Sequence, residues 1–386
     1  MKIAIIANGF SGATLPLAKH LYEKKHHIDC FYIVSMGATC IESIDFSSPI
    51  PYHFAPIGLE KSNKLFSYLP SKVQVNLLPV FRKMVRLERI GIGRALPIVN
   101  RLLIKHYLDD LQLEKYDIIN VIVHTELEVL ICKELKKKKI PFVITYHEVF
   151  KQLTGKLSLK DEVKNTLCLN TPIILHSDNV KKELLNWGKI EAGRVRMIHF
   201  GAFESYSSYG DVNSIHPGVD DYFLYLGHIK PYKGLGVLYE ASLLCKESIQ
   251  FVVAGGGYDE TITKMLSSKN FVIYNRFMSN DEVVSLIRKC KALVLPYLSA
   301  SQSGLVQTAM VFNKPIIASA VGAFPEIVQN DKNGLLVPAG DSDSLAKAIN
   351  EFEHFQFEPV YSREYDWGHI CEQYVELFNS IINENS

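Results

Sequence analysis

The chain has 386 residues, of which 47% are hydrophobic and 22% are charged, and its formal net charge is +1. This length predicts two domains, and the balance of apolar and charged residues excludes a disordered chain. The small net charge argues against a protein that mainly coats nucleic acid.

The seven cysteines are scattered along the chain and form no CxxC pair, which indicates reduced thiols and predicts no zinc site. The first ten residues enter a strand directly and lack the basic-then-apolar order of a signal peptide. No stretch approaches the roughly 20 continuous apolar residues that a membrane-spanning helix needs. We therefore expect a cytoplasmic protein.

Short apolar runs alternate with stretches of helical period, a pattern typical of parallel sheets with helices on both faces. In chain order we expect strands at 3–7, 30–34, 118–123, 142–145 and 173–175, a linker at 201–220, strands at 222–226, 251–254, 271–274, 292–295 and 315–318, and a closing helix near 367–382. The predicted fold class is α/β, with two Rossmann-like, doubly wound domains facing a cleft. Open α/β sheets bind their ligands at the carboxyl ends of the strands.

Two features of the first half are open to two interpretations. The turn Gly9-Phe-Ser-Gly12 follows the first strand, so Gly12 would let a phosphate or an acceptor approach the backbone; a plain βα turn is the alternative. Residues 61–105 carry many Lys and Arg against the single acid Glu88, with apolar residues between them. Such a segment would dock on anionic lipid, or it is the solvated basic face of core helices.

The strongest local signal is the turn from Gly227 to Gly234, which reads GHIKPYKG between a strand and a helix. Its glycines permit close backbone approach, and Lys230 and Lys233 place two ammonium groups at the carboxyl end of the strand. A diphosphate leaving group needs such positive charge as its bond to a sugar breaks. The alternative is an ordinary βα turn with solvated lysines.

Two later turns have a similar character. Gln302, Ser303 and Gly304 precede a predicted helix, whose free N–H groups and dipole form an anion site; a well-capped helix is the alternative. Glu326 opens a further helix after Gly322 and would accept a hydrogen bond from a sugar or ribose hydroxyl. Its alternative role is favourable negative charge at a helix N-terminus.

Taken in order, these turns resemble the family 4 glycosyltransferases, which are retaining enzymes of the GT-B fold. Gly227 to Gly234 matches the family's G-R-L-x-x-x-K-G turn, and Ala254 to Gly257 matches its A-G-x-G turn. The run from Asn313 to Glu326 is similar to its G-x-P-x-I-A-S-x-x-G-x-x-x-E motif. In the first half, Val123-His124 and Thr145-Tyr-His-Glu148 look like its H-x-H and T-x-H-D strand ends. Several motifs in one order are far more specific than any one of them.

The sequence departs from the family pattern at two places. The arginine of the first turn falls on His228, and the family's two glutamates, eight positions apart, fall on Ala300 and Thr308. Those glutamates contact the donor sugar and the ribose in the family. The paired-glutamate motif is therefore replaced here, and the resemblance leaves ribose recognition unassigned.

The resemblance implies a glycosyltransferase that moves a sugar from a nucleotide-sugar donor to a glycan or lipid-linked acceptor with retention, in surface polysaccharide or glycoconjugate synthesis. We expect an acceptor-binding domain at 1–205, a nucleotide-sugar-binding domain at 206–365, and a helix at 366–386 that packs back on the first domain. No metal is expected, and no cofactor besides the donor substrate. If the basic segment 61–105 docks on lipid, the protein would lie on the inner face of a membrane.

The predicted site combines both domains. The catalytic residues are His124, Lys230 and Lys233, and the donor-binding residues are Gly12, Gly227, Gln302, Ser303, Gly304 and Glu326. A nucleotide-dependent oxidoreductase or a sugar epimerase is a rival within enzymes, and the missing G-x-G-x-x-G motif argues against the former. A catalytically silent binding or scaffold protein is the alternative from another class.

Overall fold

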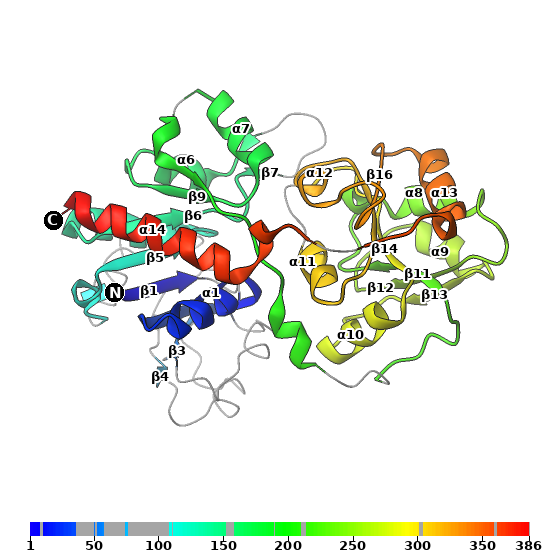
Figure 1. Cartoon of the computed structure of the whole chain (residues 1–386), viewed down its shortest axis with the longest axis horizontal. Coiled ribbons are helices and arrows are strands. Elements are labelled where there is room, and N and C mark those ends of the chain that lie inside the picture. Colours follow the sequence, from blue (N-terminus) through cyan, green and yellow to red (C-terminus); the bar gives the residue numbers. More distant parts are fainter. Residues whose placement is uncertain are drawn as a thin grey trace, which may run out of the picture.

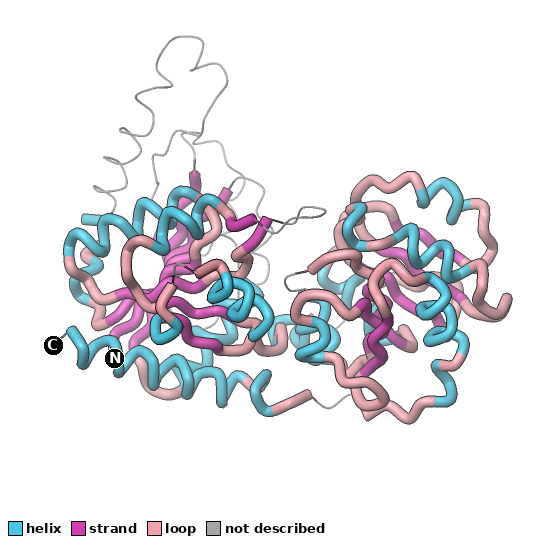
Figure 2. Tube along the Cα trace, turned by 90° about the horizontal axis from the view of Figure 1, so that it is seen from above, coloured by secondary structure: helices cyan, strands magenta, loops and turns pink. Residues whose placement is uncertain are grey.

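The computed structural model describes residues 1–7, 11–35, 50, 52–57, 74–75, 108–109, 111–151, 158–188, 190–209, 214–300, 304–358 and 361–385. Gln302, Ser303 and all but residues 74–75 of the basic segment 61–105 lie outside this part, as do residues 8–10 of the first turn. The described chain forms two lobes, which are separate in both perpendicular views (Figures 1 and 2).

A parallel sheet forms the centre of the first lobe. Counting only strands in the described ranges, it has eight, in the order β10-β9-β6-β5-β1-β2-β3-β4. Neighbouring strands all run parallel. The strands are β1 (Lys2–Ala7), β2 (His27–Ser35), β3 (Tyr52–Ile57), β4 (Gln74–Val75), β5 (Ile118–Ile122), β6 (Phe142–Thr145), β9 (Ile173–Leu175) and β10 (Val195–Met197).

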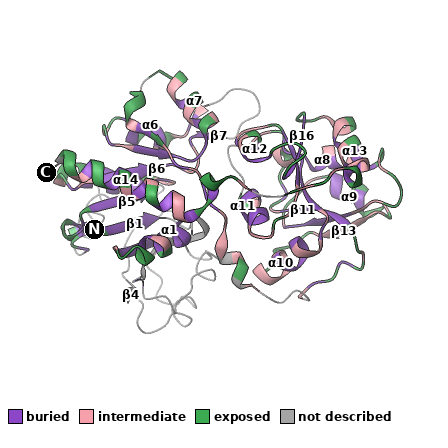
Figure 3. Ribbon diagram, viewed as in Figure 1, coloured by how far each residue is buried: buried purple, intermediate pink, exposed green. Residues whose placement is uncertain are grey.

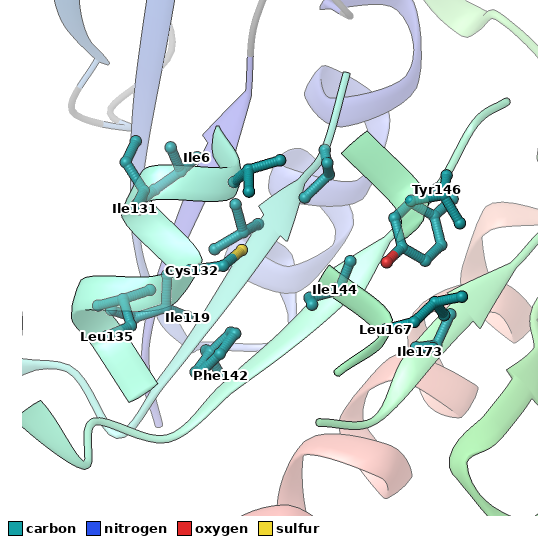
Figure 4. Packing of buried hydrophobic residues seen from close by; sticks show 14 of the residues in the cluster. Ile6, Ile119, Ile131, Cys132, Leu135, Phe142, Ile144, Tyr146, Leu167 and Ile173 are labelled. Carbon is teal, nitrogen blue, oxygen red and sulfur yellow. The ribbon is translucent and has the colours of Figure 1, made fainter. Parts of the chain in front are cut away.

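Helices cover both faces of this sheet, because successive residues of a strand point to opposite sides. Ala4 and Ile6 of β1 pack with the layer formed by α5 (Glu126–Lys138), α6 (Asp161–Leu167) and α7 (Asp178–Asn186). Figure 4 shows part of this layer, with Cys132 and Leu135 of α5 close to the strands. The central strands β5, β6 and β9 are buried on both faces, whereas the helices expose their outer sides (Figure 3). These central strands therefore read as mostly apolar runs.

The second lobe repeats this arrangement with six parallel strands in its described part, in the order β13-β12-β11-β14-β15-β16. Its strands are β11 (Tyr222–Leu226), β12 (Gln250–Ala254), β13 (Phe271–Tyr274), β14 (Ala292–Leu295), β15 (Ile316–Ser319) and β16 (Gly334–Val337). Its helices are α8 (Leu235–Ser242), α9 (Thr261–Leu266), α10 (Asn280–Lys289), α11 (Gly304–Val311), α12 (Phe324–Ile327) and α13 (Ser342–Asn350). The strands predicted from sequence are all present.

The chain passes between the lobes twice, and the two passages meet. The first includes the short 3-10 helix η5 (Glu204–Ser208), and the second leads through η8 (Arg363–Tyr365) into α14 (Trp367–Asn385). Trp367 donates its indole N–H to the carbonyl of Ala202 at 2.6 Å. A Cβ atom on Gly201 would lie 2.5 Å from the same indole, so only glycine lets the passages approach this closely.

Helix α14 returns to the first lobe and lies beside α1 (Ser11–Glu23) on the same face of the sheet (Figure 1). Ile370, Phe378 and Ile381 of α14 join Ile3 and Ile5 of β1 in one buried cluster. Sequentially distant ends of the chain therefore build one face of the first domain. The boundaries at 205 and 365 stay predictions, and no helix within the described ranges is both long and apolar enough to cross a membrane.

We expect Phe378→Ala to lower the free energy of unfolding by about 3–5 kcal/mol, because it leaves a cavity where a fully buried ring packs α14 on the sheet. The measurement is denaturant unfolding followed by circular dichroism. The matched control is Leu266→Ala, which removes apolar atoms at a position that is 68% exposed and should change stability by less than about 0.5 kcal/mol. Equal stability of the two variants would contradict the prediction.

Candidate functional site

The turn after β11 brings a lysine against a glycine. Gly227 has φ 113°, and a Cβ atom there would lie 3.1 Å from Nζ of Lys233 and 3.3 Å from Leu305 of α11. Gly234 has φ 68°, and a Cβ there would lie 1.8 Å from the carbonyl oxygen of Pro296. Both glycines are needed for the backbone geometry. The turn thus holds the Lys233 ammonium beside the carboxyl end of β11.

Lys233 is held in a setting that disfavours its charge. Burial first, and the nearby Lys230 second, lower the pKa of Lys233 to about 8. Its ammonium lies 5.2 Å from the ring centre of Tyr297. This distance allows a cation–π interaction, which offsets part of the free energy lost when the ammonium is removed from water. Lys230 is exposed. An anion bound at this turn would pair with Lys233 and favour its protonated form.

A pocket of about 310 Å³ opens next to this turn. Its walls come from the ends of β11 and β12, from the turn before α10 and from the first half of α11; they include Gly227, His228, Gly255, Phe277, Leu305 and Thr308. Binding pockets for drug-sized ligands begin at about 300 Å³ and are mostly apolar with a few polar groups. The pocket therefore has the size and lining of a small-molecule site.

Helix α11 begins at Gly304, at the edge of this pocket. A Cβ on Gly304 would lie 2.8 Å from the ring of Phe203, and the backbone N–H of Phe203 donates to the carbonyl of Gln307 at 3.2 Å. The first passage between the domains thus packs on the start of α11. Whether Gln302 and Ser303 bind a donor stays a prediction, since both lie outside the described residues.

The pocket contains no carboxylate where the family pattern places its second glutamate. Thr308 is buried, lines the pocket, and donates its hydroxyl to the carbonyl of Gly304 at 2.8 Å. Ala300 is at the other predicted position. A Cβ atom on Gly322 would lie 1.9 Å from the carbonyl oxygen of Ala300, so the two backbones are in close contact. The alignment of these two positions with the family's glutamates stays a prediction.

His124 lies directly after β5 in the first domain. Burial first, and the positive charge of Lys160 second, lower the pKa of its imidazole. Lys160 in turn forms an ion pair with Glu148. Across the domains, burial and then the Glu148 carboxylate raise the pKa of Tyr232, which belongs to the Lys230–Lys233 turn. The Glu148 carboxylate acts on both His124 and Tyr232. His124 therefore lies near the turn that carries Lys230 and Lys233, called the cationic turn below.

A buried acid fixes the backbone at His124. The carboxylate of Glu128 accepts hydrogen bonds from the N–H of His124 at 3.2 Å and from the N–H of Thr125 at 2.6 Å. Glu128 is fully buried, and burial raises its pKa. Thr125 and Glu128 form a capping box at the start of α5. The sequence Thr-Glu-Leu-Glu carries the signature of this box, which could have identified Glu128 as a residue that positions His124.

Two further predicted donor-binding residues belong to helices. Gly12 is in the first turn of α1, and its role in donor binding stays a prediction. Glu326 of α12 directs its carboxylate to the start of α7, in the first domain.

Sequence reasoning missed two aromatic residues of the pocket. Phe277 lines it and is 67% exposed, and Tyr206 reaches it from the first passage between the domains. Burial raises the pKa of the Tyr206 hydroxyl. Only the clustering of tyrosines in the linker hinted at Tyr206, and nothing in the local sequence marked Phe277. In the described part of the chain, no cluster of three His, Cys, Asp or Glu side chains is placed to hold a metal ion.

Two facing doubly wound domains with a pocket at the strand ends define a GT-B protein, and solved structures agree. The crystal structure of Anabaena HepE with UDP and glucose superimposes with a TM-score of 0.69 at 15% identity, covering 98% of this chain and 100% of that one. The lipopolysaccharide outer core galactosyltransferase WaaB gives 0.61 at 17% identity, with all of both chains covered. The predicted GT-B fold is confirmed.

Residues 220–353 match the family model described as "Glycosyl transferases group 1". The O-antigen chain mannosyltransferase C of Escherichia coli is 23% identical over 186 residues, which are 43% of this chain and 48% of that protein. The phosphatidyl-myo-inositol mannosyltransferase of Mycobacterium leprae is 26% identical over 187 residues, 44% of this chain and 50% of that protein. The chain spans about half the length of these relatives. The predicted resemblance to family 4 glycosyltransferases is confirmed.

The pKa of Lys233 predicts how anion binding depends on pH. We expect the affinity for UDP or GDP, whichever binds more tightly, to be constant between pH 7 and about 8 and to fall by up to tenfold per pH unit above that. The reason is that the empty site holds Lys233 protonated below pH 8 and neutral above it, while the bound diphosphate favours the ammonium. Titration calorimetry should detect proton uptake on binding at pH 9. In Lys233→Met the affinity should be low and this proton uptake absent; a wild-type affinity that is unchanged up to pH 9.5 would contradict the assignment.

Proposed function

We propose that this protein transfers a sugar from a nucleotide-sugar donor to a glycan or lipid-linked acceptor with retention of anomeric configuration. The observation that carries the proposal is the Lys233 ammonium, held at Gly227 beside a pocket of about 310 Å³ in a segment that matches the glycosyl transferases group 1 model. A cation at the carboxyl end of a strand next to such a pocket suits a nucleoside diphosphate.

In this proposal the donor lies along the carboxyl ends of β11 and β12. Its nucleoside occupies the pocket, with the base against the exposed ring of Phe277. Its diphosphate lies at the turn, where Lys230 and Lys233 compensate the charge that develops as it leaves. The lysines and the helix start at Gly304 supply this compensation without a metal ion. The proposal therefore includes full activity in the presence of a chelator.

The acceptor lies on the side of the first domain, near His124. The bond between the anomeric carbon and the diphosphate oxygen breaks, and the bond between that carbon and the acceptor oxygen forms on the same face. The proton of the acceptor hydroxyl passes to the departing phosphate oxygen. A lowered pKa keeps His124 neutral at pH 7, so that it orients hydroxyl groups by hydrogen bonds without repelling the lysines.

The class of acceptor is proposed from the relatives. Those that match include an enzyme named for O-antigen chains and another named for a diphospho-undecaprenol-linked sugar. We place the protein in surface polysaccharide or glycoconjugate synthesis, in the cytoplasm. Contact with the inner face of the membrane would use the basic segment 61–105.

Fold likeness alone does not separate a transferase from an epimerase. The UDP-GlcNAc 2-epimerase of Methanocaldococcus jannaschii shares the fold with a TM-score of 0.61 at 14% identity. The family match over 220–353 favours a transferase. The silent scaffold remains the alternative from the other class. The lowered pKa of the half-buried Lys233 argues against it, because burying an ammonium reduces stability and a scaffold has no use for that charge.

The first test is thermal unfolding with a panel of nucleoside diphosphates and nucleotide-sugars, with and without EDTA. A ligand at 100 times its Kd should add about 2.7 kcal/mol of stability. Stabilisation by nucleotides of one base, unchanged by EDTA, would support the donor site and name its base. Stabilisation by none of them would refute the transferase and favour the silent scaffold.

Lys233→Ala should lower kcat by about 10²–10³-fold, the usual effect of removing one group that stabilises transition-state charge. Transfer is measured by release of nucleoside diphosphate. The control is Lys291→Ala, which removes a lysine paired with Glu353 on the surface of the same domain and should leave kcat unchanged. Equal rates for the two variants would contradict the role of Lys233.

Phe277→Ala should raise the Kd of the nucleotide by about 5- to 150-fold, because stacking of a base on an aromatic ring contributes about 1–3 kcal/mol. Tyr258→Ala is the matched control. Tyr258 is also an exposed aromatic residue, at 84%, just after a neighbouring strand, but it is not among the residues that line the pocket. If both substitutions change Kd equally, the base does not lie against Phe277.

A further inference from the structure

The carboxylate of Glu326 joins the two domains. It belongs to α12 in the second domain, and it accepts hydrogen bonds from three groups at the start of α7 in the first. Oε1 accepts from the Ser177 hydroxyl at 2.8 Å and from the Asn179 N–H at 2.8 Å, and Oε2 accepts from the Asp178 N–H at 3.0 Å. Both oxygens are thus committed across the interface.

The start of α7 is a favourable place for this carboxylate. The first N–H groups of a helix have no partner within the helix, and the helix dipole is positive at that end. Ser177 is fully buried and caps the helix by accepting from the N–H of Val180 at 3.2 Å, while it donates to Glu326. Glu326 therefore completes the cap of a helix that belongs to the other domain, through hydrogen bonds strengthened by its charge.

On the second-domain side, the segment that carries Glu326 is fixed at several points. Phe324 of α12 is fully buried, and the carbonyl of Glu326 accepts the Tyr365 hydroxyl at 3.2 Å. Tyr365 lies on the second passage between the domains, and its ring centre is 4.8 Å from that of His199 on the first passage. The contact of Glu326 with α7 is thus adjacent to both chain passages.

The same segment also reaches the donor side. The side chain of Asn179 donates to the carbonyl of Gly322 at 3.5 Å, and Gly322 packs so closely on Ala300 that a Cβ would lie 1.9 Å from its carbonyl oxygen. Ala300 precedes the start of α11 at the pocket. A chain of contacts therefore runs from α7 of the first domain through Gly322 to Ala300 in the second domain.

We infer that Glu326 is a positioning residue, a third connection between the domains that fixes the cationic turn opposite His124, and that it does not bind the donor. The inference rests on the proposed transfer reaction, in which groups from both domains must meet at one anomeric carbon. A displacement of about 1 Å between reacting groups can cost about 100-fold in rate. Two chain passages alone leave the domains free to rotate about the line that joins them, and the Glu326 contact opposes that rotation.

The test compares Glu326→Gln and Glu326→Ala for nucleotide Kd and for kcat. We expect Glu326→Ala to lower kcat by about 10- to 100-fold with nucleotide Kd changed less than twofold, because the pocket lies within the second domain apart from Tyr206. Glu326→Gln keeps an acceptor oxygen and should retain more activity than Glu326→Ala. A tenfold rise in Kd with kcat intact at saturating donor would overturn the inference and make Glu326 a donor ligand.

Two further variants separate positioning from simple loss of stability. Ser177→Ala removes one of the three donors to Glu326, so its effect on kcat should not add to that of Glu326→Ala in the double variant. Asp341→Ala removes a carboxylate that caps α13 within the second domain and should leave kcat unchanged. Additive effects of Ser177→Ala and Glu326→Ala, or an equal loss of kcat in Asp341→Ala, would contradict the positioning role.

A distance measurement keeps the inference testable if the transfer reaction itself is wrong. Spin labels on one exposed site of each domain, read by pulsed electron resonance, should give a broader distance distribution in Glu326→Ala than in the wild type. An unchanged distribution would overturn the connection between the domains. Failure of the wild type to bind any nucleotide, with the distribution broadened in the variant, would instead refute the proposed function and support the connection.

Discussion

The indole of Trp367 holds together the two places where the chain passes between its domains. It donates to the carbonyl of Ala202 and covers Gly201, so the two passages cannot separate without breaking a buried contact. From this point the chain enters α14, which closes one face of the first domain, while Phe203 continues to the start of α11. The stability of the first domain and the edge of the donor pocket therefore depend on the same crossing.

The electrostatics of the site follow from burial more than from pairing. Lys233 lies near another cation and lacks a salt bridge within the described residues, so burial lowers its pKa to about 8. Glu326, in contrast, has three hydrogen-bond donors from the positive end of α7. The negative side chain is thus satisfied by the other domain, whereas the positive one is left to be satisfied by a ligand. This asymmetry is what makes the turn suited to a diphosphate.

Much of the fold could be predicted because buried parallel strands read as apolar runs. Residues 142–145, 222–226 and 292–295 were placed at the bounds that the structure gives. Among the strands that the sequence did not predict, three have a weak local signal: β3 contains His53 and Pro56, β10 contains an exposed Arg196, and β16 has only three apolar residues after a glycine. Their strand conformation comes from pairing with a neighbour that is distant in sequence, which local composition does not report.

The sequence by itself determined the two doubly wound domains and the turn from Gly227 to Gly234, because glycine, lysine and apolar spacing act locally on the backbone. Only the tertiary structure decided where long-range partners lie. It turned the carboxylate of Glu326 toward α7, brought Tyr206 and Phe277 to the pocket, and packed α14 on β1. Each of these contacts joins segments far apart in the chain, and its free energy comes from surfaces that become neighbours only when the domains have folded.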